Sequence, residues 1–283
     1  MKKALTLFAF IACSALAIAQ NTTYQLIEDN PRALPGSFVV LEPVGLDGGS
    51  GGDISLYTGG TVFWALTDNL NLEGIARYNL LTLGGTGSGF HLEAGGFYPI
   101  SSREVKKDVP VILKTSLYAG KTADNKKYID EVKYFKVNGT YLNQMGPRGG
   151  IYFKKSGFEF KDESSLTTET NYTLTGAYIG WEKLTQAFVK TKVGDEYKYG
   201  QGQTRIYLDA LIVPVRTIAD EMLGDPERNG ILGFRLGLQW NKNPYREKEK
   251  GLELNPVYTV ELGSRPISGF YAQMSFGLNI FNK

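Results

Sequence analysis

The fold is decided by the last stretch of the chain, which reads Gly269-Phe270-Tyr271-Ala272-Gln273-Met274-Ser275-Phe276-Gly277-Leu278-Asn279-Ile280-Phe281. Every second residue from Phe270 to Ile280 is apolar, whereas the residues between them are mostly polar or small. A period of two predicts an extended strand with one apolar and one polar face. The stretch is about twice as long as a usual strand of about 5–6 residues, and long enough for a tilted strand of about 9–11 residues to cross a bilayer. We therefore expect it to close a transmembrane β-barrel by pairing with the first strand.

Earlier segments repeat this alternation and are separated by polar or glycine-rich connections. The strands expected before the closing one are 37–43, 54–66, 70–82, 89–99, 110–120, 131–142, 151–160, 171–182, 204–215, 230–240 and 255–263. The pattern thus predicts an all-β, antiparallel, up-and-down barrel of about 12 strands, with 10 or 14 as alternatives. An even number of strands returns both ends of the barrel to the same side of the membrane.

Several connecting segments carry turn or loop signals. Residues 45–52 are rich in glycine and predict a loop, and residues 143–150, which contain Gly146-Pro147, predict a turn. Residues 101–108 indicate a charged turn. Residues 183–203 are the hardest to interpret, and both a long loop and a protruding hairpin remain open.

The N-terminus has the pattern of a secretory signal peptide. Met1-Lys2-Lys3 precedes a short apolar run that ends in Ala17-Ile18-Ala19, which predicts cleavage after Ala19. Cys13 also leaves open a lipoprotein signal, although apolar sequence continues after it. The expected organisation is a signal peptide (1–19), a periplasmic lead-in (20–36) and a barrel (37–283).

The charge balance excludes some classes of partner. The chain has 31 Lys and Arg against 29 Asp and Glu, so removal of Lys2 and Lys3 with the signal leaves equal numbers. We therefore expect no nucleic-acid partner. No stretch after the signal approaches the roughly 20 apolar residues of a membrane-spanning helix, so a spanning chain must be a closed barrel.

The polar faces of the expected strands predict the lining of the lumen. These residues are Glu73, Arg77, His91, Glu93, Lys114, Asp209, Arg235 and Glu261. Their mixed signs suit a polar barrel interior. A second set, Trp64, Trp181, Trp240 and Phe281, lies near strand ends and predicts an aromatic girdle at one membrane interface.

The sequence offers little for catalysis or metal binding. A hydrolytic nucleophile needs a base within hydrogen-bond reach, and His91 is the only histidine in the chain. Removal of Cys13 with the signal would leave carboxylates as the main metal ligands, without the spacing of a calcium loop. We expect a non-enzymatic protein without a cofactor.

The chain resembles Gram-negative outer-membrane β-barrel proteins over its whole mature length. The resemblance rests on the signal, on the turn Leu66-Thr67-Asp68-Asn69-Leu70-Asn71-Leu72 and on the aromatic-rich closing strand. These motifs are generic and do not identify a subfamily. One departure is that Asn282 and Lys283 follow Phe281, whereas the family's closing strand usually ends on an aromatic residue.

Two functional hypotheses follow. The first is a structural or accessory subunit of an outer-membrane complex, and the alternative is a porin-like diffusion channel for small polar solutes. A secreted β-sandwich surface module and an outer-membrane lipid hydrolase are further alternatives. The expected partners are outer-membrane lipid, other outer-membrane proteins and, through basic runs such as 103–107, lipopolysaccharide.

Overall fold

The fold is given by a computed structural model, which describes residues 23–34, 36–50, 54–67, 69–83, 89–116, 120–121, 127–128, 131–161, 167–218, 230–241, 255–267 and 269–282. The expected signal peptide, residues 1–19, lies outside the described residues. Among the described segments, no helix is both long and apolar enough to cross a membrane.

The described residues form strands and one short 3₁₀ helix, η1. The strands are β1 (Gln25–Asp29), β2 (Phe38–Gly49), β3 (Ile54–Thr67), β4 (Leu70–Leu83), β5 (Phe90–Phe97), β6 (Ser101–Ser116), β7 (Gly120–Lys121), β8 (Lys127–Tyr128), β9 (Glu131–Lys161), β10 (Thr167–Val193), β11 (Glu196–Ile218), β12 (Leu232–Asn241), β13 (Asn255–Arg265) and β14 (Gly269–Asn282). The helix η1 (Pro31–Ala33) follows β1, and the side chain of Asn30 caps it by accepting a hydrogen bond from the backbone N–H of Arg32.

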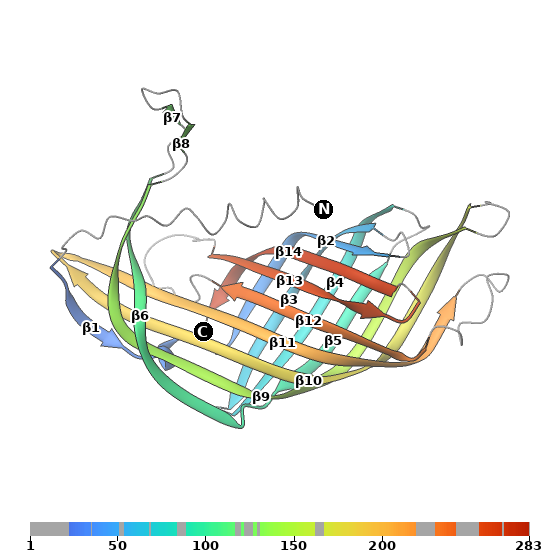
Figure 1. The fold of residues 1–283 in the computed structure, drawn as a ribbon, viewed down its shortest axis with the longest axis horizontal. Coiled ribbons are helices and arrows are strands. Elements are labelled where there is room, and N and C mark those ends of the chain that lie inside the picture. The colour runs from blue at the N-terminus through green and yellow to red at the C-terminus, as the bar shows by residue number, and fades with distance from the viewer. Residues whose placement is uncertain are drawn as a thin grey trace, which may run out of the picture.

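Ten strands close into an antiparallel barrel (Figure 1). Their order is β10-β11-β12-β13-β14-β2-β3-β4-β5-β9, and β9 pairs with β10 to complete the ring. The prediction of an all-β antiparallel barrel is confirmed, but the closed barrel has ten strands rather than twelve. Two further strands, β1 and β6, belong to the same sheet without being part of the ring.

The closing strand behaves as its alternation predicts. β14 pairs with β13 on one side and with β2, the first barrel strand, on the other. Tyr271, Gln273 and Asn279 are buried, whereas Phe270 and Met274 are exposed. Burial therefore follows the polar set of the strand and not its apolar set.

This inverted polarity extends around the barrel. The buried positions include many charged side chains, and large apolar side chains cover the outside. On β12, for example, Arg235 is buried while Leu236 and Leu238 are exposed. A soluble β-sandwich has the opposite arrangement, with its apolar faces packed against each other.

Glycines account for one incorrect expectation. Residues 45–49 belong to β2 instead of a loop. A Cβ at Gly45 would lie 2.1 Å from the ring of Tyr57, so glycine is what lets this ring lie across the strand. Glycine here marks a close side-chain approach inside a strand.

The expected turn at 143–150 is also wrong, because β9 is continuous over 31 residues. Pro147 lacks an N–H, but it lies where the neighbour of β9 changes from β6 to β5. There its carbonyl accepts a hydrogen bond from the backbone N–H of Tyr98. Residues 101–108, expected as a charged turn, form the start of β6 and pair with β9. The gap between these two neighbours tolerates the proline, and the edge position of β6 tolerates the exposed charges.

Beyond one end of the barrel, β9, β10 and β11 continue and form what we call the extension, together with β1 and β6 (Figure 1). Residues 183–203 are therefore a protruding hairpin of β10 and β11. The described part of the lead-in is ordered, because β1 pairs with β10 and the backbone N–H of Asn30 bonds the carbonyl of Phe188.

The extension has its own apolar core, and the buried face of the strands changes where it begins. In the barrel part of β9, Arg148 and Lys154 are buried, whereas Phe135 and Val137, on the other face, are buried in the extension. Val109 and Val111 of β6 complete this core. A Cβ at Gly200 of β11 would lie 2.8 Å from the carbonyl oxygen of Pro110, so β6 folds over to meet β11.

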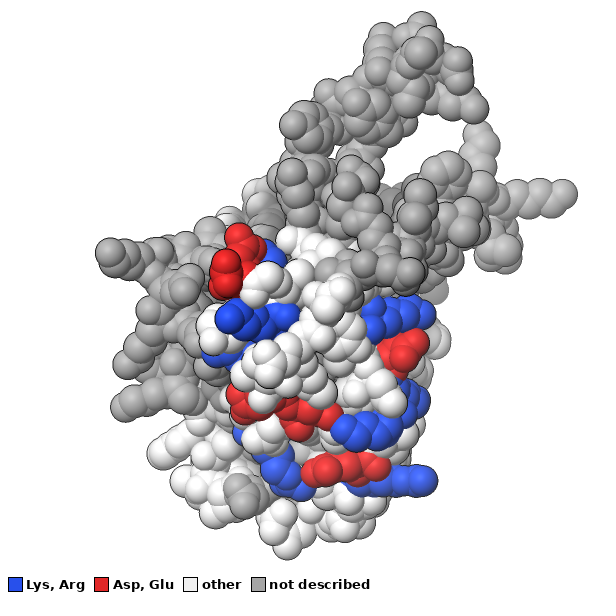
Figure 2. Space-filling model, turned by 90° about the vertical axis from the view of Figure 1, so that its left-hand side faces the viewer, with Lys and Arg blue, Asp and Glu red and all other residues white. Residues whose placement is uncertain are grey.

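The outer surface of the extension carries charges of both signs. Figure 2 views the molecule from this end and shows blue and red side chains next to each other. Exposed ion pairs join Arg32 to Glu104 and Lys136 to Asp108. Polar groups outside and apolar groups inside are the arrangement of a water-soluble domain.

Candidate functional site

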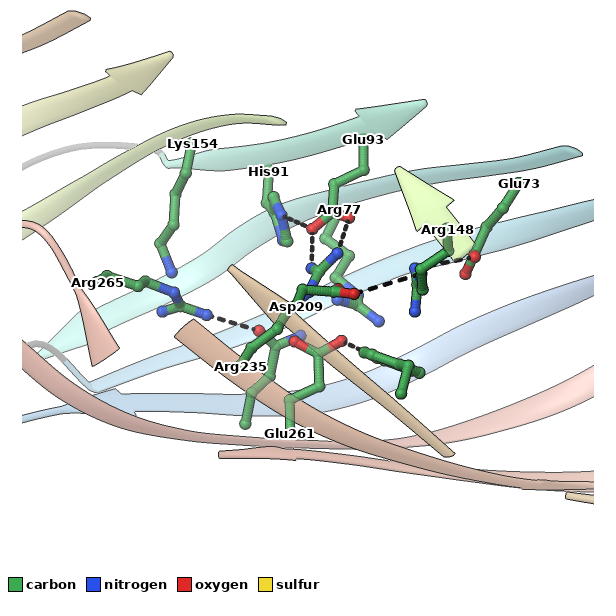
Figure 3. Close-up of polar contacts among 12 residues, drawn as sticks. Glu73, Arg77, His91, Glu93, Arg148, Lys154, Asp209, Arg235, Glu261 and Arg265 are labelled. Atoms are coloured by element: carbon green, nitrogen blue, oxygen red, sulfur yellow. Dashed lines mark hydrogen bonds and ion pairs between the residues drawn. The ribbon is translucent and has the colours of Figure 1, made fainter. Parts of the chain in front are cut away.

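Seven of the eight residues expected to line the lumen lie in the barrel interior. They come from β4, β5, β11, β12 and β13 and point toward one another (Figure 3). The seven are Glu73, Arg77, His91, Glu93, Asp209, Arg235 and Glu261. Lys114 is the exception, because its backbone lies in β6, which pairs only with β9 outside the ring.

Arg235 is the centre of this network. Its Nη1 and Nη2 donate to the two carboxylate oxygens of Glu93 at 2.5 and 2.8 Å, and its Nε donates to Asp209 at 2.6 Å. The guanidinium also lies 4.6 Å from the ring centre of Tyr178. Bidentate arginine–carboxylate pairs form strong charge-assisted hydrogen bonds. Only 1% of Arg235 is exposed, so its pair with Glu93 is shielded from water.

A second bidentate pair joins β4 to β2. Arg77 donates from Nε and Nη2 to Glu42 at 2.7 and 3.1 Å, and Thr61 donates to the same carboxylate at 3.4 Å. Nearby, the hydroxyl of Tyr207 donates to Glu261 at 2.6 Å. The Arg77–Glu42 and Tyr207–Glu261 contacts join strands that are not neighbours in the sheet, whereas Thr61 and Glu42 lie on the neighbouring strands β3 and β2.

Asp47 links the interior side chains toward the end of the barrel that lies opposite the extension. This carboxylate accepts hydrogen bonds from Lys154 and, at 2.8 Å, from Nη1 of Arg265. Arg265 also donates to Gln273, whose amide donates to the hydroxyl of Tyr57 at 3.1 Å. The network thus continues from the middle of the barrel to this end.

At the extension end, two carboxylates share one guanidinium. Arg205 donates from Nε to Glu182 at 2.7 Å and from Nη2 to Glu73 at 2.8 Å. Arg148 donates to Glu73 at 3.2 Å, and its guanidinium lies 4.0 Å from the ring centre of Tyr207. The two arginines and two carboxylates balance in charge.

Sequence reasoning missed about half of the interior charges. These are Glu42, Asp47, Arg148, Lys154, Glu182, Arg205 and Arg265. Arg205 could have been predicted from the sequence, because it precedes Tyr207 and Asp209 on the polar face of β11 at a period of two. Arg148 gave no such signal, because the surrounding Gly-Pro-Arg-Gly-Gly reads as a turn.

The interior is filled with side chains at the level of this network. Asp209, Arg235 and Glu261 each expose only 1% of their surface to water. A water-filled channel would leave its lining exposed. Among the described residues, the barrel is therefore closed to solvent at mid-height.

A cavity of about 380 Å³, partly open to solvent, does exist where the barrel meets the extension. Its polar lining includes Gln144, Gln186 and Gln203, and its floor is the Glu73–Arg205–Glu182 ion-pair group. Phe38, Phe63 and Phe97 add aromatic rings to the wall, and Arg32 and Leu34 of the N-terminal segment line its outer side.

The expected girdle residues lie on strands that run toward the extension. Trp64, Trp181 and Trp240 belong to β3, β10 and β12, and each is 45–55% exposed on the outer face. These strands have the same direction in the antiparallel ring. The backbone of Phe281 lies in β14, which also runs this way, but its side chain is outside the described residues.

The histidine takes part in the ion-pair network. His91 Nε2 lies 2.8 Å from Glu93 Oε1, and its ring is 5.2 Å from that of Tyr152. Within the described ranges, no three His, Cys, Asp or Glu side chains come together as a metal site. The chemistry that these contacts support is mutual neutralisation of buried charges.

Comparison with protein-family models, with curated protein sequences and with solved structures finds no match for this chain.

Proposed function

We propose that this protein is a β-barrel of the Gram-negative outer membrane that acts as a structural or accessory subunit of a larger complex. The observation that carries the proposal is the inverted polarity of the barrel, with paired charges inside and exposed leucine, isoleucine, phenylalanine and tryptophan outside. In water this arrangement would expose a large apolar surface, which marks a membrane or protein interface. In lipid it matches the apolar band of a membrane barrel, about 25 Å tall.

The closed interior favours the structural role over the porin-like alternative. Solute diffusion needs a continuous aqueous path, and the Arg235 group occupies the middle of the barrel. Ion pairs that join opposite walls also make the barrel rigid, which suits a scaffold. Removal of one partner would leave a buried charge uncompensated.

The extension supplies a surface for assembly. It lies at the end of the barrel where β2 begins and β14 ends, which we assign to the periplasm because an even-stranded barrel has both termini there. Its edge strand β6 carries exposed Arg103, Lys106 and Lys107. On this assignment, other outer-membrane proteins are the expected partners of the extension, and the outer wall contacts lipid and lipopolysaccharide.

The first experiment tests the membrane assignment and the closed interior. Protein refolded in detergent should show heat-modifiable gel migration and a β-type circular-dichroism spectrum, and should float with lipid vesicles. In planar bilayers, inserted protein should give no single-channel steps. A chain that stays folded and monomeric without detergent would contradict the membrane assignment, and regular conductance steps would favour the channel.

The second experiment tests the subunit role. Affinity purification of the tagged full chain from native membranes, after mild cross-linking, should recover a partner in stoichiometric amounts. The test variant is Lys107→Glu on the exposed face of β6, which should reduce recovery while leaving gel migration unchanged. Recovery of the chain alone would refute a stable complex.

A further inference from the structure

The cavity between barrel and extension has a composition suited to a specific ligand. At about 380 Å³, it falls within the range of small-molecule sites, about 300–1,000 Å³. It is lined by barrel residues on one side and by Arg32 and Leu34 on the other. Three residues of its lining, Glu73, Glu182 and Arg205, belong to the ion-pair network, which continues through Arg148 to Asp209 at mid-barrel.

Amide groups in and beside this cavity lack hydrogen-bond partners. Gln203 is 6% exposed, lines the cavity, and its Oε1 accepts no hydrogen bond. Asn241 pairs with Gln203 across β11 and β12, and both polar atoms of its buried side chain are also unpartnered. A buried polar group without a partner costs stability, and each such group calls for a reason such as a bound molecule.

The buried charges of the site are already neutralised within the protein. Glu73 and Glu182 share Arg205, and Arg148 also contacts Glu73. The floor therefore offers no net charge to attract an ion. A ligand would meet amides that both donate and accept hydrogen bonds.

Aromatic rings form the remaining wall. The rings of Phe38 and Phe63 lie 4.5 Å apart, and Phe97 lines the same cavity. Flat apolar faces next to amides suit a molecule with hydroxyl groups at its edge and C–H groups on its face. Neutral sugars have this combination.

We infer that the cavity is a binding site for a small neutral saccharide. The hydroxyl groups of the sugar bond Gln203 and its neighbouring amides, and one face of the ring packs against the phenylalanines. Charged sugars are excluded because the buried floor has no unpaired ion to receive them.

The test uses the full chain in a zwitterionic detergent, since glycoside detergents would offer sugar headgroups to the same site. Maltose is the neutral probe, and glucuronate and glucosamine are the charged probes. Saturation-transfer difference NMR should show transfer to maltose and little to either charged sugar. Absence of transfer to maltose, or equal transfer to all three sugars, would overturn the inference.

Two variants locate the binding. Gln203→Leu removes the unpartnered amide and should weaken maltose binding about tenfold or more while the folded gel band remains. Leu34→Trp fills the cavity from the N-terminal segment and should block maltose binding without changing any amide. If Gln203→Leu does not fold, Leu34→Trp alone tests whether maltose binds in this cavity. Asn138→Leu, an exposed amide on β9, is the control and should bind normally. Maltose binding retained in a folded Gln203→Leu or Leu34→Trp variant would refute this location.

Discussion

Arg235→Met tests the view that interior ion pairs hold the barrel closed. The substitution keeps an unbranched side chain but leaves Glu93 and Asp209, which Arg235 contacts at 2.5–2.8 Å, without their shared cation. Removal of one partner from a buried ion pair costs about 3–5 kcal/mol. The ratio of folded to unfolded protein should therefore fall by about two to three and a half orders of magnitude.

The double variant Arg235→Met/Glu93→Gln sharpens the test. It converts Glu93, one of the two carboxylates that lose Arg235, to a neutral amide, so it should recover about 0.5–3 kcal/mol of the loss. Urea unfolding in lipid vesicles, followed by tryptophan fluorescence and by gel migration, measures both values. Lys136→Met is the matched control, because its ion pair with Asp108 is exposed, and its midpoint should stay near that of the wild type.

The reasoning is refuted if Arg235→Met unfolds at the urea concentration of the wild type. It is also refuted if the double variant is no more stable than Arg235→Met. In either case the interior charges would not be bound to each other with the strength that their burial implies.

Three other perturbations test separate parts of the structure. Leu236→Arg, on the outer face of β12, should destabilise the barrel in vesicles by about 2–4 kcal/mol if the site faces mid-bilayer lipid, and unchanged urea unfolding would contradict that location. Gly237→Ala should cost about 1–3 kcal/mol by overpacking, because a Cβ there would lie 2.0 Å from the ring of Tyr207; a thermal gel-shift midpoint equal to that of the wild type would contradict it. Asp29, in the extension, is partly buried, which raises its pKa, but hydrogen bonds from Lys106 and Thr140 outweigh this and hold the pKa below its ordinary value of 3.8. A carboxyl whose pKa is lower in the folded than in the unfolded protein stabilises the fold above the unfolded pKa, and this stability is lost as the pH falls through the folded pKa. Hydrogen exchange in residues 25–34 of the wild type should therefore quicken below about pH 4. In Asp29→Ala the same residues should exchange rapidly already at neutral pH.

The strands that could be predicted from the sequence are those whose two faces differ in polarity. β4, β5, β12 and β14 each have one face toward the charged interior and one toward the outside, so alternation alone assigned their residues correctly. The lumen residues on these strands, such as Arg77 and Arg235, could be named for the same reason.

The pattern fails where a strand is buried on both faces or carries local turn signals. Residues 186–189 of β10 are buried in succession, because one face meets the barrel end and the other meets the extension core. Alternation disappears there, and a hairpin cannot be told from a loop. In β9, Gly146 and Pro147 suggest a turn, and only the change of neighbouring strand explains why the chain continues straight.

If the barrel lies in lipid as proposed, the change of buried face within β9 and β10 places one pair of strands in two solvents, lipid and water. The extension hides Phe135, Val137 and Val189 as a water-soluble protein does, so we expect it to fold before any lipid is present. Its paired β-strands would then fix the alignment of β9, β10 and β11, which are adjacent in sequence and joined along most of their length. Insertion into the bilayer would then begin from the sheet of β9, β10 and β11, and the remaining barrel strands would pair onto its edges. The charged surface of the extension would keep this end of the protein in water and so limit how deeply the barrel inserts.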